Sequence, residues 1–159
     1  RECEGEIWVR GYNVMKGYFN LPEATAETIT QNGWLRTGDI GVMDDHGYLR
    51  ITDRIKDMYI MNGENVYPAE VEKVIAAMDG VAQVAVIGVP RKQQGEVGHA
   101  FVVLAPGASL SEDSVLSWCA DRLARYKVPF NVKFVDALPM NAMNKVLKPE
   151  LRKLAASGS

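Results

Sequence analysis

Cysteine and histidine are scarce in this sequence, which contains only two of each among 159 residues. Cys3 and Cys119 provide no disulfide framework, and no Cys or His spacing is typical of a metal site. His46 falls in a predicted turn and His99 near a predicted strand start, without partners at ligand spacing. We therefore expect no metal site formed by this chain, a buried free thiol at Cys119, and a reducing, cytoplasmic environment.

Long apolar runs are also lacking. No stretch of 18 or more apolar residues occurs, so the sequence predicts no transmembrane segment, and no signal-peptide pattern opens it. Hydrophobic residues make up 47% and charged residues 24% of the chain, which is typical of a soluble globular domain. Because the first residue is Arg1 and a strand-like pattern follows at once, we expect a fragment of a longer protein.

Charge is unevenly distributed, although the net charge is only −2. Residues 1–121 contain 10 basic and 18 acidic side chains, whereas residues 122–159 contain 8 basic and 2 acidic ones. This basic segment is either a solvated face or a surface for a polyanion. Since no row of aromatic residues accompanies it, a nucleotide-like small molecule fits better than a nucleic acid strand.

The order of predicted elements indicates an α+β fold. Residues 6–10 and 42–52 have strand patterns, with a turn at 44–47, and a short helix is expected at 22–28. After a polar boundary near 53–65, a helix begins at Pro68, because apolar residues recur there at helical spacing. Further strands are expected at 81–89, 100–104 and 131–135, with a helix after Ser111 and another from Pro149.

Two segments of the first half contain candidate nucleotide ligands. In Gly-Trp-Leu-Arg-Thr-Gly-Asp at 33–39, Asp39 follows a Thr-Gly turn and could accept two hydrogen bonds from the vicinal hydroxyls of a ribose. In Asp-Arg-Ile-Lys-Asp at 53–57, Arg54 could donate to ribose or phosphate oxygens, and Lys56 falls at the predicted domain boundary. Taken alone, the first segment is more often an ordinary turn and the second a solvated strand than a ligand site.

Two segments of the second half contain the remaining candidates. Residues 61–72 read Met-Asn-Gly-Glu-Asn-Val-Tyr-Pro-Ala-Glu-Val-Glu, and the glycine, Gly63, allows a ligand or another chain segment to approach the backbone closely. Residues 138–148 read Leu-Pro-Met-Asn-Ala-Met-Asn-Lys-Val-Leu-Lys. Lys145 could bring a compact positive charge into a phosphate site, or it could be an exposed and inert lysine.

Together and in this order, the four segments resemble the adenylate-forming superfamily, which includes acyl-CoA synthetases, luciferases and the adenylation domains of peptide synthetases. The resemblance extends over roughly residues 5–155. It implies that residues 1–56 are the end of a large N-terminal domain, β-rich and ending at a hinge. Residues 57–159 would then be a small mobile C-terminal domain with a short central sheet flanked by helices.

The resemblance also implies an activity and its cofactors. A carboxylic acid and ATP, with Mg²⁺ bound mainly outside this chain, would give an acyl-adenylate and pyrophosphate, after which the C-terminal domain rotates and CoA forms the thioester. The implied partners are these small molecules and the N-terminal domain of the same protein, with no nucleic acid.

Each candidate residue takes a role from the resemblance. Asp39 would bind the ribose hydroxyls with support from Arg54, and Lys56 would be the hinge. Lys145 would bridge ATP phosphate and acyl carboxylate. The contacts with CoA would come from five residues: Asn62, Gly63, Glu64, Tyr126 and Lys127.

The sequence departs from the family pattern at Asn144, where glycine is frequent, although asparagine tolerates unusual backbone angles. The family's phosphate-binding loop and acyl pocket have no counterpart here, so we expect the isolated chain to be inactive. The expected parent is an AMP-forming acyl- or aryl-CoA synthetase. An adenylation domain that acts without CoA and a non-catalytic binding module remain as alternatives.

Overall fold

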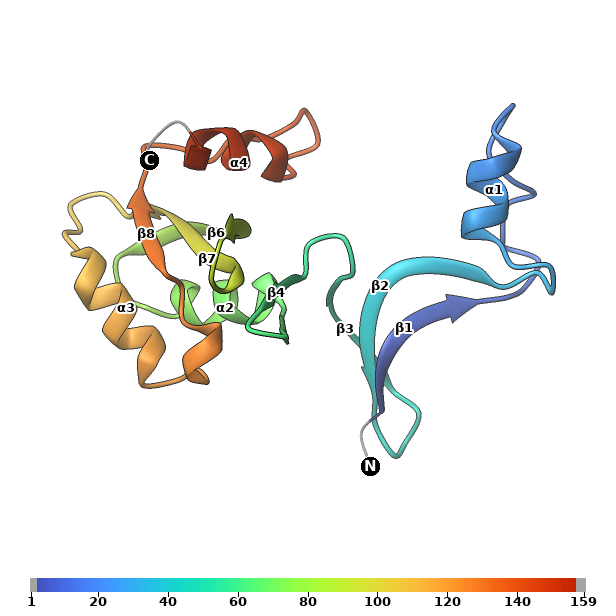
Figure 1. Ribbon diagram of the computed structural model, residues 1–159, viewed down its shortest axis with the longest axis horizontal. Helices are drawn as coiled ribbons and strands as arrows, with labels where there is room; N and C mark the ends of the chain where they lie inside the picture. The colour runs from blue at the N-terminus through green and yellow to red at the C-terminus, as the bar shows by residue number, and fades with distance from the viewer. Residues whose placement is uncertain (1–2, 157–159) are drawn as a thin grey trace. The chain divides into compact units, whose positions relative to one another are not determined.

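The computed structural model describes residues 3–156 and divides the chain into two compact units, Arg1–Lys56 and Asp57–Ser159 (Figure 1). Each unit has its own sheet.

The first unit is built around a three-stranded antiparallel sheet with the order β1-β2-β3. Its elements, in chain order, are β1 (Cys3–Val9), α1 (Pro22–Thr28), β2 (Leu35–Met43) and β3 (Leu49–Arg54). Helix α1 has a proline in its first turn. Backbone N–H groups there have no partner within the helix, so the missing N–H of proline costs no hydrogen bond. The helix at 22–28 is therefore confirmed.

The expected strand at 42–52 is wrong in its bounds, because it merges the end of β2 with β3. The predicted turn lies between them, where Asp44 Oδ1 accepts from the backbone N–H groups of His46 and Tyr48, each at 2.9 Å. The Thr-Gly-Asp segment is also not a turn, since residues 37–39 belong to β2. Gly38 has φ +72° within that strand, which explains the turn-like composition.

The second unit is built around a mixed sheet. Antiparallel strands follow the order β5-β4-β7-β6, and β8 pairs in parallel with β7. Its elements, in chain order, are β4 (Tyr59–Met61), β5 (Glu64–Val66), α2 (Pro68–Ala76), β6 (Val81–Arg91), β7 (Gly95–Leu104), α3 (Glu112–Ala120), the 3₁₀ turn η1 (Arg125–Lys127), β8 (Asn131–Phe134) and α4 (Lys148–Ala156).

Helices cover both faces of this sheet (Figure 1). On one face, Val71 and Ile75 of α2 and Val115 of α3 pack in a cluster of buried side chains. On the other face, Leu151 and Ala155 of α4 pack in a second cluster. Since neighbouring residues of β6 and β7 alternate between the two clusters, the sheet is buried on both sides. The predicted α+β class, with helices flanking a central sheet, is confirmed.

Helix α3 begins where the sequence predicts. Ser111 Oγ accepts from the backbone N–H of Ser114 at 3.1 Å, and the Ser114 side chain reaches back to the backbone N–H of Ser111, so a capping box closes this end. Cys119 near the other end is a buried free thiol, as expected. Burial raises the pKa of Cys119 to about 11, against a smaller opposite effect of Arg122, so the thiol is protonated at neutral pH. Within the described residues, no helix has the length and apolar character needed to cross a membrane.

Candidate functional site

Asp39 and Arg54 are brought together by the register of β2 against β3, although 15 positions separate them in the sequence. Arg54 Nε donates to Asp39 Oδ1 at 2.8 Å. The Arg54 side chain is 65% exposed and the Asp39 side chain 22% exposed. The pair therefore offers a planar cation beside a fixed carboxylate, which suits hydroxyl or phosphate oxygens of a ligand.

The backbone that presents Asp39 is held by three hydrogen bonds around Thr37. Thr37 Oγ1 donates to Ile7 O at 2.8 Å and accepts from the Asp39 backbone N–H at 3.1 Å. Glu6 Oε1 accepts from the Gly38 N–H at 3.1 Å. Strand β1 thus fixes the position of the Asp39 carboxylate. The sequence of residues 33–39 alone does not predict these contacts with β1.

Lys56 is exposed and lies in a turn that follows β3. It is the last residue of the first compact unit, and Asp57 is the first residue of the second. Its neighbour Ile55 still donates a backbone hydrogen bond to Gly38 O at 2.9 Å, so the first unit is ordered up to this point. The backbone torsions between the units therefore include those of Lys56, where we expected a hinge.

Asn62 and Gly63 form the two-residue turn of a hairpin between β4 and β5, where the sequence predicts only a polar boundary. Both residues have positive φ, +52° and +86°, as a tight hairpin turn requires. A Cβ on Gly63 would meet nothing within 4 Å, so the backbone conformation rather than a close neighbour accounts for the glycine within this chain. Asn62, Gly63 and Glu64 are all exposed at the tip.

Tyr126 and Lys127 lie in η1, and this 3₁₀ turn contacts β5, the second strand of the hairpin. Lys127 Nζ is 2.7 and 2.8 Å from the two carboxylate oxygens of Glu70 on α2. The Lys127 side chain is only 20% exposed. A ligand phosphate at Lys127 would therefore have to compete with, or add to, an existing carboxylate partner, a constraint that the sequence did not indicate.

Lys145 is exposed on a loop between β8 and α4. The base of the loop is closed by an isolated antiparallel bridge between Met140 and Val146, and by a hydrogen bond from Leu147 N to Pro139 O at 2.8 Å. Asn144 has φ +57°, the left-handed conformation in which glycine is most common. The departure at Asn144 thus preserves the backbone that the family pattern implies.

Several basic side chains of the C-terminal stretch have partners within the second unit. Lys148 Nζ lies 3.2 Å from Asp57 Oδ2 and 3.5 Å from Glu72 Oε1. The Arg122 guanidinium lies 3.4 Å from the centre of the Trp118 ring. Together with the pair between Lys127 and Glu70, these contacts show that part of the basic charge is paired within the second unit.

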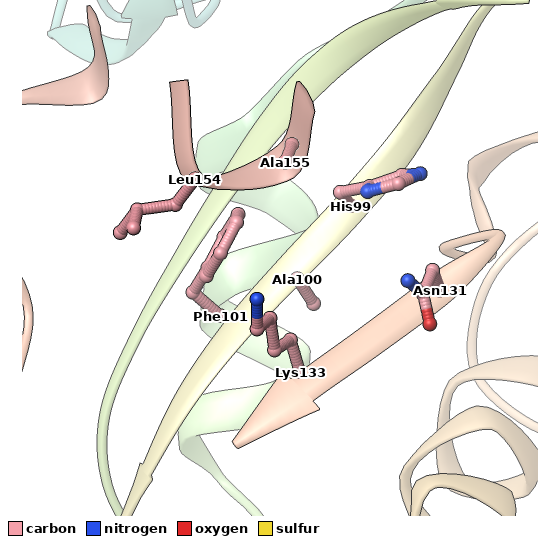
Figure 2. Close-up of a pocket in the computed structure, with 7 residues that line it drawn as sticks. All are labelled: His99, Ala100, Phe101, Asn131, Lys133, Leu154 and Ala155. Carbon is pink, nitrogen blue, oxygen red and sulfur yellow. The ribbon is translucent and has the colours of Figure 1, made fainter. Parts of the chain in front are cut away.

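A small hollow separate from the four motifs lies between β7, β8 and the end of α4 (Figure 2). Its polar wall consists of His99, Asn131 and Lys133, and Phe101 and Leu154 form part of the apolar wall. Burial, and secondarily the charge of Arg91, lower the pKa of His99 below its ordinary value of 6.5. Within residues 3–156, no three His, Cys, Asp or Glu side chains gather as they would around a metal ion.

Comparison with known proteins identifies relatives for nearly the whole chain. The sequence model of the AMP-binding enzyme C-terminal domain matches residues 70–145. A methyl-dioxo-octahydroindenyl-propanoyl:CoA ligase of Rhodococcus jostii is 59% identical over 150 residues, which is 94% of this chain and 29% of the relative. A feruloyl-CoA synthase of an Amycolatopsis species is 51% identical over 94% of this chain and 30% of its own length.

A solved structure agrees with the fold described above. The ATP-bound MatB of Rhodopseudomonas palustris has a TM-score of 0.90 and 45% identity, covering 96% of this chain and 30% of that protein. The chain thus spans about 30% of the length of the curated relatives and of the solved structure it matches.

Proposed function

We propose that this chain is the C-terminal part of an ATP-dependent, AMP-forming CoA ligase of the adenylate-forming superfamily. The model of the AMP-binding enzyme C-terminal domain matches residues 70–145, and the relatives that are similar over 94% of the chain are CoA ligases. The complete protein first joins a carboxylate to the α-phosphate of ATP and releases pyrophosphate. The thiol of CoA then attacks the acyl carbon of the acyl-adenylate and AMP leaves. We assign the carboxylate pocket, most of the ATP site and the Mg²⁺ that accompanies ATP to parts of the protein outside this chain.

The observation that best supports this proposal is the exposed Lys145 on a loop whose base is closed by hydrogen bonds. In the proposed first step, the negatively charged carboxylate of the substrate approaches the negatively charged α-phosphate of ATP. The Lys145 ammonium bridges the two groups and offsets their repulsion. A preorganised cation at that place lowers the barrier, because it needs no reorganisation during the reaction.

The other candidates take complementary roles. The carboxylate of Asp39 accepts from the ribose hydroxyls while Arg54, already 2.8 Å away, fixes its orientation. Lys56, between the compact units, is the proposed hinge that turns the domain between the two steps.

In the second step, the exposed hairpin tip at 62–64 lines the path of the CoA thiol arm, and Tyr126 and Lys127 contact the nucleotide of CoA. Support for this grouping comes from the contact between β5 and η1. The ammonium of Lys127 is held by Glu70, so we propose that it contributes a positioned charge rather than a free one.

A product-balance assay on the longer protein tests the proposal. With ATP, CoA and a panel of aryl, acyl and dicarboxylic acids, at least one acid is expected to yield AMP, pyrophosphate and an acyl-CoA in equal amounts. Pyrophosphate release with no thioester would instead indicate an adenylating enzyme that does not use CoA. No pyrophosphate with any acid would contradict the proposed function.

A further inference from the structure

The loop that carries Lys145 is organised by one polar side chain, Asn141, which the motif comparison does not single out. Asn141 Oδ1 accepts from two backbone N–H groups, that of Met143 at 3.0 Å and that of Lys145 at 2.9 Å. The Asn141 backbone adds two further bonds, from its own N–H to Lys145 O at 2.9 Å and from Asn144 N to its carbonyl at 3.0 Å.

This arrangement fixes the peptide groups on both sides of the Lys145 α-carbon. Its N–H is bound to the Asn141 side chain and its C=O to the Asn141 backbone. Asn144, immediately before Lys145, has a left-handed backbone conformation, and the chain reverses direction there within the hydrogen-bonded loop 141–145. The direction in which the Lys145 side chain leaves the loop therefore depends on the carboxamide of Asn141.

Nothing else in the described chain requires this carboxamide. Asn141 belongs to neither of the two buried clusters of the second unit, and its side chain accepts hydrogen bonds from Met143 and Lys145 of its own loop. Its removal is thus expected to loosen the loop without unfolding the domain.

We infer that Asn141 is a positioning residue for Lys145, which it holds in the orientation needed for the adenylation step. This inference rests on the proposed function of Lys145. Because a displacement of about 1 Å in a reacting group can reduce a rate by about 100-fold, loss of the Asn141 acceptor is expected to slow adenylation even though Asn141 does not touch the substrate.

Three variants test this inference. Asn141→Ala removes the acceptor, Asn141→Asp keeps an oxygen at the same place, and Ser111→Ala is the matched control. Ser111 also caps a backbone N–H with its side chain, but at the start of α3.

The first readout is hydrogen exchange at individual amides, measured by NMR on this chain. In Asn141→Ala, the amides of Met143 and Lys145 are expected to exchange about 10-fold faster, whereas Asn141→Asp keeps their protection and Ser111→Ala leaves them unchanged. Unchanged exchange at both amides in Asn141→Ala would overturn the inference, whether or not the longer protein is a ligase.

The second readout separates the two half-reactions in the longer protein. In Asn141→Ala, kcat for pyrophosphate release is expected to fall by about 10- to 100-fold, with KM for ATP little changed. CoA attack on a supplied acyl-adenylate is expected to keep its rate, and Asn141→Asp to recover most of the loss. An equal loss in both half-reactions, or the same loss in Ser111→Ala, would assign Asn141 a merely structural role. Absence of pyrophosphate release in the unmodified protein would instead refute the proposed function.

Discussion

Asn144 shows how a single backbone conformation can matter for the site. At φ +57° a β-branched side chain is strained by about 1–3 kcal/mol, whereas glycine is not. We expect Asn144→Val to lower the free energy of unfolding of this chain by about that amount, and Asn144→Gly to leave it nearly unchanged. Urea unfolding measures both.

Asn20 provides the control for this prediction, since it has φ +55° in the first unit. Asn20→Val is expected to cost similar stability without slowing the adenylation step of the longer protein, which Asn144→Val should slow. If Asn144→Val were as stable and as active as the unmodified protein, the backbone at 144 would not control the site.

His99 is expected to make the stability depend on pH. Burial, then the charge of Arg91, lower its pKa in the folded state below 6.5, so the unfolded state binds the proton more readily. The stabilisation is therefore complete above the unfolded pKa and is lost as the pH falls through the lower folded pKa. We expect His99→Gln to reduce the loss of unfolding free energy between about pH 7.5 and pH 5, measured by urea unfolding.

His46→Gln is the matched variant, because His46 lies exposed in the turn between β2 and β3. It makes the same chemical change at an exposed position and so controls for the effect of the substitution itself. A pH dependence that His99→Gln does not alter would show that another group is responsible.

Among the elements of the second unit, β4 packs across β6 and β7 through one aromatic side chain. Tyr59 is buried, and a Cβ on Gly98 would lie 2.3 Å from the Tyr59 hydroxyl oxygen, whereas a Cβ on Gly88 would lie 2.3 Å from Tyr59 Cβ. The hydroxyl itself has no hydrogen-bond partner among residues 3–156. Gly88 therefore makes room for the base of the Tyr59 side chain, and Gly98 makes room for its hydroxyl end.

A double-substitution experiment follows from this geometry. Gly98→Ala and Gly88→Ala are each expected to lower the free energy of unfolding by about 1–3 kcal/mol through overpacking. Tyr59→Phe removes the atom that Gly98→Ala would meet, so it should restore much of the stability lost in Gly98→Ala but little of that lost in Gly88→Ala. Urea unfolding of the single and double variants measures the coupling, and equal rescue of both would contradict this packing.

The sequence predicts the longer elements better than the short ones. Helices α2 and α3 follow from apolar spacing and from the Ser111 cap, and β6 and β7 from their apolar content. The sequence does not predict most of strand β2, since its glycines resemble a turn. The hairpin of β4 and β5 is too short and too exposed at its tip to show an alternating pattern.

In the candidate site, too, some features are predictable from the local sequence and others depend on the fold. Local motifs identify Asp39, Arg54 and Lys145, but the pairing of Asp39 with Arg54 depends on strand register, and that of Lys127 with Glu70 on tertiary packing. Asn141 could have been suspected, because asparagine side chains often cap nearby backbone N–H groups in turns.

At the scale of the whole molecule, the chain contains two compact units and spans about 30% of the length of its relatives. We expect this chain alone to release no pyrophosphate from ATP and any carboxylic acid, because the first step is assigned to groups beyond it. A coupled pyrophosphate assay with the purified chain checks this. Sustained release above a chain-free control would contradict the assignment.

The most direct test of the central claim is the rate of each half-reaction in Lys145→Ala of the longer protein. Adenylation is expected to slow by about 10²- to 10³-fold through loss of one positioned charge, while CoA attack on a supplied acyl-adenylate keeps its rate. Lys153→Ala is the control, since Lys153 is an exposed lysine paired with Glu150 on α4, and both rates should be unchanged in it. An equal loss of both half-reactions in Lys145→Ala, or no loss of either, would contradict the role proposed for Lys145.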